Sequence, residues 1–298
     1  MKEMQEYQIG NTPLVEIEPV CGNRIWVKLE SRNFLGSSKA RTAYGIIRDL
    51  PPEAQGKTII ESTSGNLGLA LGYFCKECGL PFEALVDATI PQPKLDALQN
   101  AGINCRLVDP EPGVDLRTSR KREARRLAET GDYYWVNQYD NPSGVKAHEQ
   151  TTGPEIWQQT GGMVTHCVCA MGSCGTIAGV GRFFKKNAPE VQVCGVEPLG
   201  SSIYGTEIQP YLNVGAGMTG KPGNLLRNLD VVDQSYTIPD AQAIACAQEL
   251  YEKFGLAVGI TSGMAYAAAM QIARTVTGAN IVVLAPDGRK PYGKYWNK

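Results

Sequence analysis

The sequence predicts an α/β protein built on buried parallel sheets. Short apolar runs rich in β-branched residues alternate with longer helix-like runs over most of the 298 residues. Runs that are apolar along their whole length are typical of strands covered on both faces. Several of them lead, through a polar and glycine-containing segment, directly into an expected helix. Together these observations favour open sheets with helices on both sides.

The expected elements follow from apolar runs for the strands and from Gly or Pro stops for the helices. In the first half we expect helix 40–50, strand 58–61, helix 67–79, strand 82–86, helix 93–101, strand 104–108 and helix 116–130. In the second half we expect strand 166–170, helix 176–187, strand 192–196, helices 241–254 and 263–277, and strand 281–285.

Two segments stand out because they are rich in turn-forming residues. The stretch 139–146 (YDNPSGVK) is rich in turn formers and is predicted as the seam between two domains. The stretch 209–228 is rich in Gly and Pro with little periodicity, which predicts a long loop. Long loops in compact domains are often functional.

Composition and charge exclude several classes of protein. The formal net charge of −1 gives no electrostatic case for a nucleic-acid partner or a membrane surface. No apolar run could span a bilayer, and the N-terminus has no signal-peptide core, so we expect a cytoplasmic protein. Nine cysteines is an odd number, which favours a reducing compartment. The pairs Cys75/Cys78 and Cys167/Cys169 lie in apolar segments, so we favour packing over a zinc site and expect no metal.

Lys39 is the candidate for covalent chemistry. It closes the segment Gly36-Ser37-Ser38-Lys39 at the start of an expected helix. The helix N-terminus is already positive, so a lysine there should have a lowered pKa, which favours the neutral amine that forms a Schiff base. Taken alone, a solvated lysine at a helix start is the simpler interpretation.

Three further junctions are polar. Segment 61–68 (ESTSGNLG) offers hydroxyls and free backbone N–H groups that suit a carboxylate, or form an ordinary capped turn. Segment 171–176 (MGSCGT) is a Gly-rich strand-to-helix loop that suits a phosphate, or a turn needed for packing. It matches neither the P-loop nor the dinucleotide fingerprint, which favours a phosphate monoester and argues against an NAD oxidoreductase.

The fourth junction, 259–263 (GITSG), is a helix cap or a further polar contact. A reactive lysine, a carboxylate site and a phosphate cradle are the parts that a pyridoxal-phosphate (PLP) enzyme of amino-acid metabolism must supply.

His148 and His166 have no Ser or Asp partner motif, so we interpret both as structural.

Eight short motifs run in order along nearly the whole chain. They are IGNTPL at 9–14, VKLE at 27–30, GSSKAR at 36–41, TSGN at 63–66, NQYDNP at 137–142, TTGPEIWQQTGG at 151–162, GSCGT at 172–176 and GITSG at 259–263. This set resembles the cysteine synthase (O-acetylserine sulfhydrylase) family of PLP enzymes. The resemblance implies two doubly wound open-sheet domains of the tryptophan synthase β kind (PLP fold type II). It also implies a smaller, mobile domain over 35–144 and a larger PLP-binding domain over 1–34 and 145–298.

The resemblance also implies roles for single residues. Lys39 would hold PLP covalently and act as general base. Asn66 would bond the cofactor's 3′ oxygen, and Ser262 would meet the pyridine nitrogen. The substrate carboxylate would be bound by Thr63, Ser64, Gly65 and Gln138. The cofactor phosphate would be bound by Gly172, Ser173, Cys174, Gly175 and Thr176.

The implied reaction is β-elimination and replacement on O-acetyl- or O-phosphoserine through an aminoacrylate intermediate, with a sulfur nucleophile added. Segment 151–162 is similar to the B-type cysteine synthases. Segments 61–71, 84–102 and 133–141 resemble diaminopropionate-pathway enzymes of siderophore and antibiotic biosynthesis, which add an amine such as glutamate. A third hypothesis is an inactive binding module of the same fold. The resemblance implies a homodimer that acts on a small amino-acid substrate.

Departures from the family pattern bear on which substrates are used. Ala40 stands where the family usually has Asp, Leu67 stands where cysteine synthases usually have Thr, and the ending 286–295 differs from the usual one. If the leaving group is a phosphate, Lys221 or Arg227 in the Gly-rich loop is a candidate partner for it. The alternative for both is a solvated loop charge.

Overall fold

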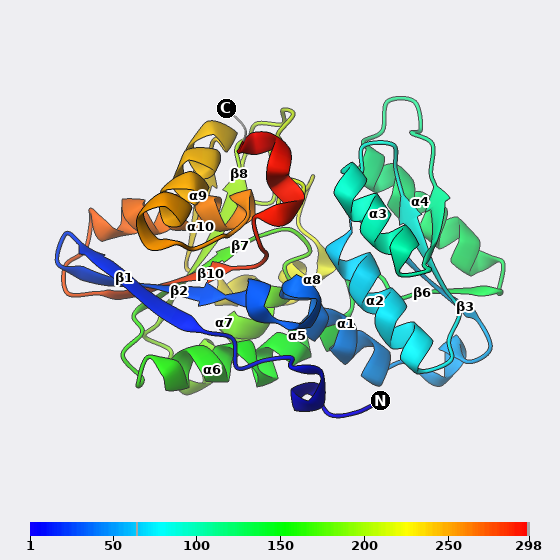
Figure 1. Cartoon of the computed structure of the whole chain (residues 1–298), viewed down its shortest axis with the longest axis horizontal. Coiled ribbons are helices and arrows are strands. Elements are labelled where there is room, and N and C mark those ends of the chain that lie inside the picture. Colours follow the sequence, from blue (N-terminus) through cyan, green and yellow to red (C-terminus); the bar gives the residue numbers. More distant parts are fainter. Residues whose placement is uncertain (64, 297–298) are drawn as a thin grey trace.

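The computed structural model describes residues 1–63 and 65–296, which form two sheets with helices on both faces (Figure 1). The larger sheet has the order β1 (Leu14–Val20), β2 (Asn23–Leu29), β10 (Asn280–Ala285), β7 (His166–Ala170), β8 (Gln192–Pro198) and β9 (Gln234–Ile238). The smaller sheet has the order β5 (Asn104–Leu107), β4 (Phe82–Val86), β3 (Thr58–Ser62) and β6 (Tyr133–Trp135). Among these described strands, every pairing is parallel except that of β1 with β2.

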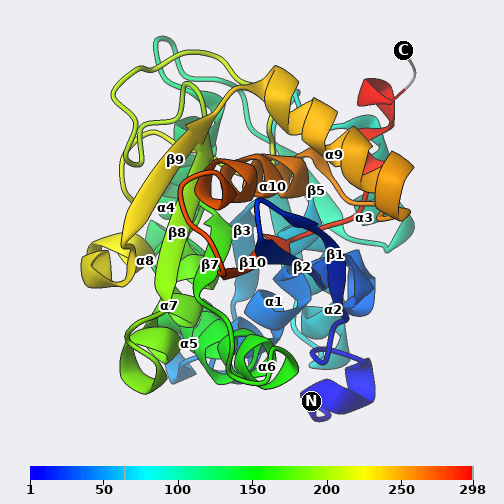
Figure 2. The ribbon, with the colours of Figure 1, turned by 90° about the vertical axis from the view of Figure 1, so that its left-hand side faces the viewer.

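The larger sheet lies between two layers of helices (Figure 2). One layer holds α9 (Asp240–Phe254) and α10 (Ile260–Ala273), and the other holds α5 (Pro142–Gln150), α6 (Thr152–Gln159) and α7 (Gly175–Asn187). The packing of strand β10 on both faces explains why its sequence is apolar throughout. Ile281, Val283 and Ala285 pack in the core beneath α10, whereas Val282 and Leu284 pack in the opposite core.

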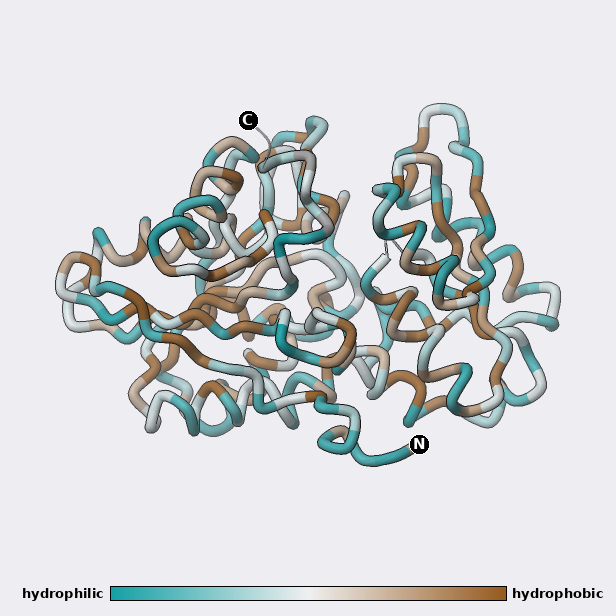
Figure 3. Tube along the Cα trace, viewed as in Figure 1, coloured by the Kyte–Doolittle hydropathy of each residue, from teal (hydrophilic) through white to brown (hydrophobic). Residues whose placement is uncertain are grey.

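The smaller sheet is covered in the same way. Helices α1 (Lys39–Arg48), α2 (Asn66–Glu77) and α3 (Gln92–Asn100) lie over one face, and α4 (Leu116–Glu129) lies over the other. Ile59 and Ile60 of β3 point into these two different cores. In Figure 3 the hydrophobic segments gather along the strands and the inner sides of the helices in both halves of the molecule.

Helix α1 joins the two halves, because it packs against both α2 and α5. A Cβ on Gly45 would lie 2.7 Å from the carbonyl oxygen of Ser143 in α5, so glycine permits this close helix contact. Lys39, the first residue of α1, is therefore held at the border between the sheets.

The expected α/β architecture with two doubly wound sheets is confirmed. Strands β1, β6 and β9 and helices α5 and α6 were not expected, and β2 was known only as a motif. Residues 142–146 of the predicted seam are helical, because Pro142 opens α5 at a position where its missing N–H costs nothing, and the seam itself stays a prediction. The limits 35–144 and the mobility of the smaller domain stay predictions.

The remaining short elements are α8 (Gly223–Leu226) and the 3-10 helices Met4–Tyr7, Glu30–Arg32, Phe34–Gly36, Pro52–Ala54, Leu229–Val231 and Lys290–Tyr295. Helix α8 interrupts the expected loop 209–228, which is otherwise irregular as predicted. Helix α10 begins at Ile260, so Thr261 and Ser262 lie inside its first turn instead of before it. Across the described ranges, no helix combines the length and the apolar character needed to cross a bilayer.

Candidate active site

The segments that follow four strands line one chamber between the sheets. Thr63 follows β3, Gln138 follows β6, Gly172 follows β7 and Asp287 follows β10, and all four lie in the wall together with Lys39. We call this space the inner chamber. The carboxyl ends of parallel strands, at the border where the chain passes between units, are where ligands bind in open α/β sheets.

The amine of Lys39 lies between two polar side chains. Its Nζ is 3.3 Å from Ser173 Oγ and 3.4 Å from Gln138 Oε1. Burial lowers the pKa of Lys39 to about 8, against the opposing attraction of Glu61 and other anionic groups. The sequence predicted this direction from the helix N-terminus, whereas the structure gives burial as the largest cause.

Gln138 is fixed by the smaller sheet. Its backbone N–H donates to Glu61 Oε2 over 3.0 Å, and its side-chain Nε2 donates to the Ser62 carbonyl over 3.1 Å. Burial raises the pKa of Glu61 to about 7, although the hydrogen bonds from Gln138 act in the other direction. Glu61 thus holds the group that contacts Lys39.

The loop before α2 begins as a cap. The Thr63 hydroxyl accepts from the backbone N–H groups of Gly65 and Gly68, over 3.1 and 3.0 Å. Gly65 has φ +131°, and a Cβ there would lie 2.6 Å from Lys94 Cδ, so this position requires glycine. Thr63 and Asn66 line the inner chamber, whereas Gly65 lines a neighbouring cavity. The predicted residue Ser64 lies outside the described residues.

The Gly-rich loop 172–176 leads into α7. Gly172 and Ser173 line the inner chamber, whereas Cys174, Gly175 and Thr176 turn the chain into the helix behind it. Cys174 has φ +58°, and burial raises the pKa of its thiol to about 12, so the thiol stays neutral. Asn224 Nδ2 donates to the carbonyls of Ser173 and Gln138, over 3.0 and 2.7 Å, and ties the two walls together.

These residues fit PLP. The helix N-terminus at α7 offers backbone N–H groups suited to a phosphate. Lys39 supplies a buried amine of lowered pKa for the aldehyde. Ser262, in the first turn of α10, is fully buried, and its Oγ has no hydrogen-bond partner within the described part of the chain. Buried hydroxyls are seldom left without a hydrogen-bond partner, so Ser262 Oγ is suited to bind a ligand atom such as a ring nitrogen.

The structure adds four charged residues that the sequence did not single out. Lys94 of α3, Arg117 and Arg120 of α4, and Asp287 also line the inner chamber. Burial raises the pKa of Asp287, against the attraction of Lys94 and hydrogen bonds from Tyr292 and Asn66. Arg120 Nε lies 2.9 Å from Asp87 Oδ2, so its charge is balanced.

The two cations suggested as phosphate partners are placed elsewhere. Lys221 lies over the ring of Tyr204, 4.5 Å from its centroid, and Arg227 donates to the backbone carbonyl of Asp140. Neither lines the inner chamber, the cavity beside Gly65 or a further cavity between α4 and segment 208–219. The cations that line the inner chamber besides Lys39 are instead Lys94, Arg117 and Arg120.

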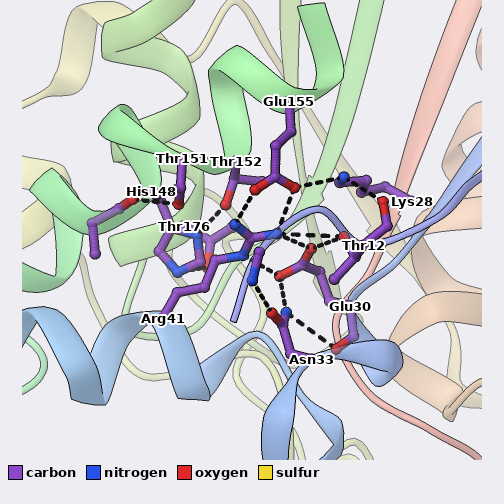
Figure 4. A network of polar contacts seen from close by, with 12 residues as sticks. Thr12, Lys28, Glu30, Asn33, Arg41, His148, Thr151, Thr152, Glu155 and Thr176 are labelled. Atoms are coloured by element: carbon purple, nitrogen blue, oxygen red, sulfur yellow. Dashed lines mark hydrogen bonds and ion pairs between the residues drawn. The ribbon is translucent and has the colours of Figure 1, made fainter. Parts of the chain in front are cut away.

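A buried polar network joins α1 to the larger sheet and to α5 and α6 (Figure 4). Arg41 Nε lies 2.8 Å from Glu30 Oε2 and its Nη1 lies 2.6 Å from Glu155 Oε1, while Lys28 Nζ lies 2.7 Å from Glu155 Oε2. His148 Nε2 lies 3.1 Å from Thr42 Oγ1 and 3.2 Å from Thr176 Oγ1.

Burial lowers the pKa of His148 to about 3, so the ring is neutral at physiological pH and joins α1 to the Gly-rich loop. These contacts hold two elements of the fold together, which is the structural role that the sequence suggested for the histidine.

Comparison with known proteins assigns the family. Residues 5–287 match the profile of the family described as "Pyridoxal-phosphate dependent enzyme". The chain belongs to this family. Cysteine synthase B of Salmonella typhimurium is 36% identical over 289 residues, which cover 95% of this chain and 91% of that relative. The enzyme is thus PLP-dependent, and the hypothesis of an inactive binding module is not supported.

Solved structures agree with this assignment. The O-acetylserine-dependent cystathionine beta-synthase of Helicobacter pylori superposes with a TM-score of 0.89 at 31% identity and covers 98% of the enzyme and 97% of that chain. O-ureido-L-serine synthase superposes with a TM-score of 0.87 at 29% identity and covers 96% and 91%. The enzyme therefore has the fold of PLP-dependent enzymes that resemble O-acetylserine sulfhydrylases.

Proposed function

We propose that the enzyme catalyses β-replacement on an O-activated L-serine and adds a sulfur nucleophile, as the cysteine synthases to which it is similar do by name. The observation that carries the proposal is the position of Lys39. Its partly buried amine lies within 3.4 Å of both Gln138, on the carboxylate side, and Ser173, on the phosphate side.

Bound PLP would supply the electron sink that makes the substrate α-proton acidic and allows the β-substituent to leave. Lys39, once free, removes the proton from Cα and later returns it, which its lowered pKa favours near neutral pH. Thr63, Ser64, Gly65 and Gln138 bind the α-carboxylate and orient the Cα–H bond toward Lys39. This orientation decides which bond is broken.

The cofactor is held by the remaining predicted residues. Gly172, Ser173, Cys174, Gly175 and Thr176 would bind its phosphate, mainly through backbone N–H groups at the start of α7. Ser262 would pair with the pyridine nitrogen. Asn66 would bond the 3′ oxygen, since its Nδ2 carries a second hydrogen besides the one given to Asp287.

The test begins with the visible spectrum of the purified holoenzyme. Addition of O-acetylserine or O-phosphoserine should change the cofactor absorbance, and sulfide should restore it with formation of cysteine, measured by mass spectrometry. Lys39→Ala should show neither change, while Lys76→Ala, an exposed lysine on α2, should behave as the wild type. A wild-type spectrum that neither activated serine alters would refute the proposal.

An amine nucleophile such as glutamate is the second candidate, because a cavity of about 550 Å³ adjoins the inner chamber and has room for an amino acid. The same experiment separates the two, since glutamate should then restore the spectrum in place of sulfide. We also propose that the enzyme is a cytoplasmic homodimer. All nine cysteines are free, which suits a reducing compartment, and sedimentation analysis measures the oligomeric state.

A further inference from the structure

A second cavity opens beside the inner chamber. This outer chamber has a volume of about 550 Å³ and lies between the start of α4, residues 87–91 and the irregular segment 208–219. The two chambers share Arg117, Arg120 and Val214. None of the described residues that are predicted to bind PLP or the serine carboxylate lines the outer chamber, so the outer chamber has room for a molecule besides the serine substrate.

One cation of the outer chamber, Arg117, has no ion-pair partner among the described residues. Asp87 is paired with Arg120, with Nε and Oδ2 2.9 Å apart. Asp115 caps α4, because its carboxylate accepts from the backbone N–H of Thr118 over 3.0 Å. Arg117 donates to the carbonyl of Gly217 and to the side chain of Tyr211, and Asp115 adds a small attraction, yet within the described ranges no carboxylate lies at ion-pairing distance from it.

Arg117 also occupies an unfavourable place for a cation. It is the second residue of α4, where the helix dipole is positive. It is partly buried, and its charge contributes to the lowered pKa of Lys39, so the two cations are near each other. A guanidinium whose hydrogen bonds go to a neutral carbonyl and a phenol is suited to a ligand anion, for which arginine offers paired N–H donors.

We infer that the second substrate is an organic nucleophile that carries a carboxylate, and that Arg117 selects it by binding this carboxylate in the outer chamber. The inference rests on the proposed β-replacement. Sulfide occupies about the volume of a water molecule, roughly 30 Å³, and needs no such space. Leu116, Ile208 and Met218 supply apolar walls for the carbon chain that joins the carboxylate to the reacting atom.

The chemistry balances for a thiol. The Cβ–O bond of the activated serine breaks and a Cβ–S bond forms, while the leaving group departs with the electron pair of the broken bond. The thiol proton is released with the leaving group as an acid. The α-proton taken by Lys39 returns to Cα, so no oxidant or reductant is needed.

Two nucleophiles of one thiol chemistry test the inference with the holoenzyme and whichever activated serine changes its spectrum. They are 3-mercaptopropionate and the neutral 3-mercaptopropanol. The wild type should use the acid with a kcat/KM at least tenfold higher. Arg117→Gln should lower kcat/KM for the acid about tenfold to a hundredfold, which is the range for a charged hydrogen bond. Values for the alcohol and for sulfide should stay within twofold.

Arg122→Gln is the matched control, since Arg122 lies on the same helix but is exposed and pairs with Glu111. Arg117→Lys should recover part of the preference for the acid. Equal use of acid and alcohol by the wild type, or equal losses on both in Arg117→Gln, would overturn the inference. So would an effect of Arg117→Gln confined to the spectral change with O-phosphoserine, because Arg117 would then bind the leaving group.

A binding measurement keeps this result separate from the proposed function. The unreactive 3-(methylthio)propionate and 3-(methylthio)propanol are titrated into the holoenzyme by calorimetry. The wild type should bind the acid at least tenfold more tightly, and Arg117→Gln should bind both alike. Failure of both activated serines to alter the spectrum would refute the β-replacement alone, whereas absence of this binding preference would refute the role of Arg117.

Discussion

Asn66 Nδ2 donates to Asp287 Oδ2 over 3.0 Å, which joins the first residue of α2 on the smaller sheet to the loop after β10 of the larger sheet. The same carboxylate oxygen accepts from Tyr292 Oη over 2.8 Å. The C-terminal segment is therefore part of the active-site wall, and one buried carboxylate orients the side chain predicted to meet the cofactor.

Replacing Asp287 should weaken both the fold and cofactor binding. In Asp287→Ala the buried donors of Asn66 and Tyr292 lose their acceptor, which costs about 1–3 kcal/mol in the free energy of unfolding. Urea denaturation measures this loss, and dialysis against PLP measures the weaker retention of cofactor. Asp287→Asn keeps an acceptor oxygen and should lose less stability and less cofactor than Asp287→Ala. Asp230→Ala, at an exposed site, should be almost as stable as the wild type. An Asp287→Ala protein as stable as the wild type would contradict the prediction.

Cofactor loading should follow the titration of Lys39. Because burial lowers its pKa to about 8, the amine is protonated and unreactive below this pH and neutral above it. The rate at which the apoenzyme takes up PLP should therefore rise with pH and level off above about pH 8. Stopped-flow absorbance of the cofactor measures this rate, with Lys39→Ala as the blank. A rate that inflects only near 10.5, the ordinary pKa of a lysine, would show that the amine is solvated.

The site residues that the sequence did not indicate are those whose position depends on tertiary contacts. Lys39 and the loop 172–176 were found because a strand, a polar loop and a helix follow one another locally. Arg117 and Arg120 were overlooked because α4 carries so many charges that it reads as a solvated helix, and only the fold turns these two inward. One feature of the sequence could have indicated that Asp287 lies in the site, namely its position directly after the closing apolar strand. Strand β1 was missed because its alternating charges reflect an edge position.

Glu61 should make stability depend on pH near neutrality. The pKa of Glu61 in the folded protein, about 7, lies above its ordinary value of 4.5, so the folded state binds this proton more tightly than the unfolded state does. The bound proton favours folding at low pH, and this contribution to stability is lost as the pH rises from 4.5 through 7. Glu61→Gln removes this buried charge and should raise the free energy of unfolding at pH 8 by up to about 3 kcal/mol. Urea titrations between pH 4.5 and 8 should show a flatter profile for the variant. If Glu61→Gln and the exposed control Glu190→Gln have the same profile, the carboxylate of Glu61 is not buried as described.

Arg41 should be the most costly ion-pair partner to remove. It lies between Glu30 and Glu155 with all three side chains largely or fully buried (Figure 4). Burial alone would raise the pKa of Glu30, yet the charge and hydrogen bonds of Arg41 hold it at about 2. Arg41→Met leaves a buried carboxylate unpaired and should lower the free energy of unfolding by about 3–5 kcal/mol at pH 7.

The pH dependence of this loss identifies its cause. Because the pKa of Glu30 is lowered in the folded protein, its ionised carboxylate stabilises the fold above pH 4.5, and this contribution is lost as the pH falls toward 2. The difference in free energy of unfolding between the wild type and Arg41→Met should therefore narrow over that range. Arg24→Gln breaks the exposed pair with Glu16 and should show a far smaller effect. A gap of constant size from pH 7 to 3 would mean that lost packing of the Arg41 side chain, and not its charge, accounts for the instability.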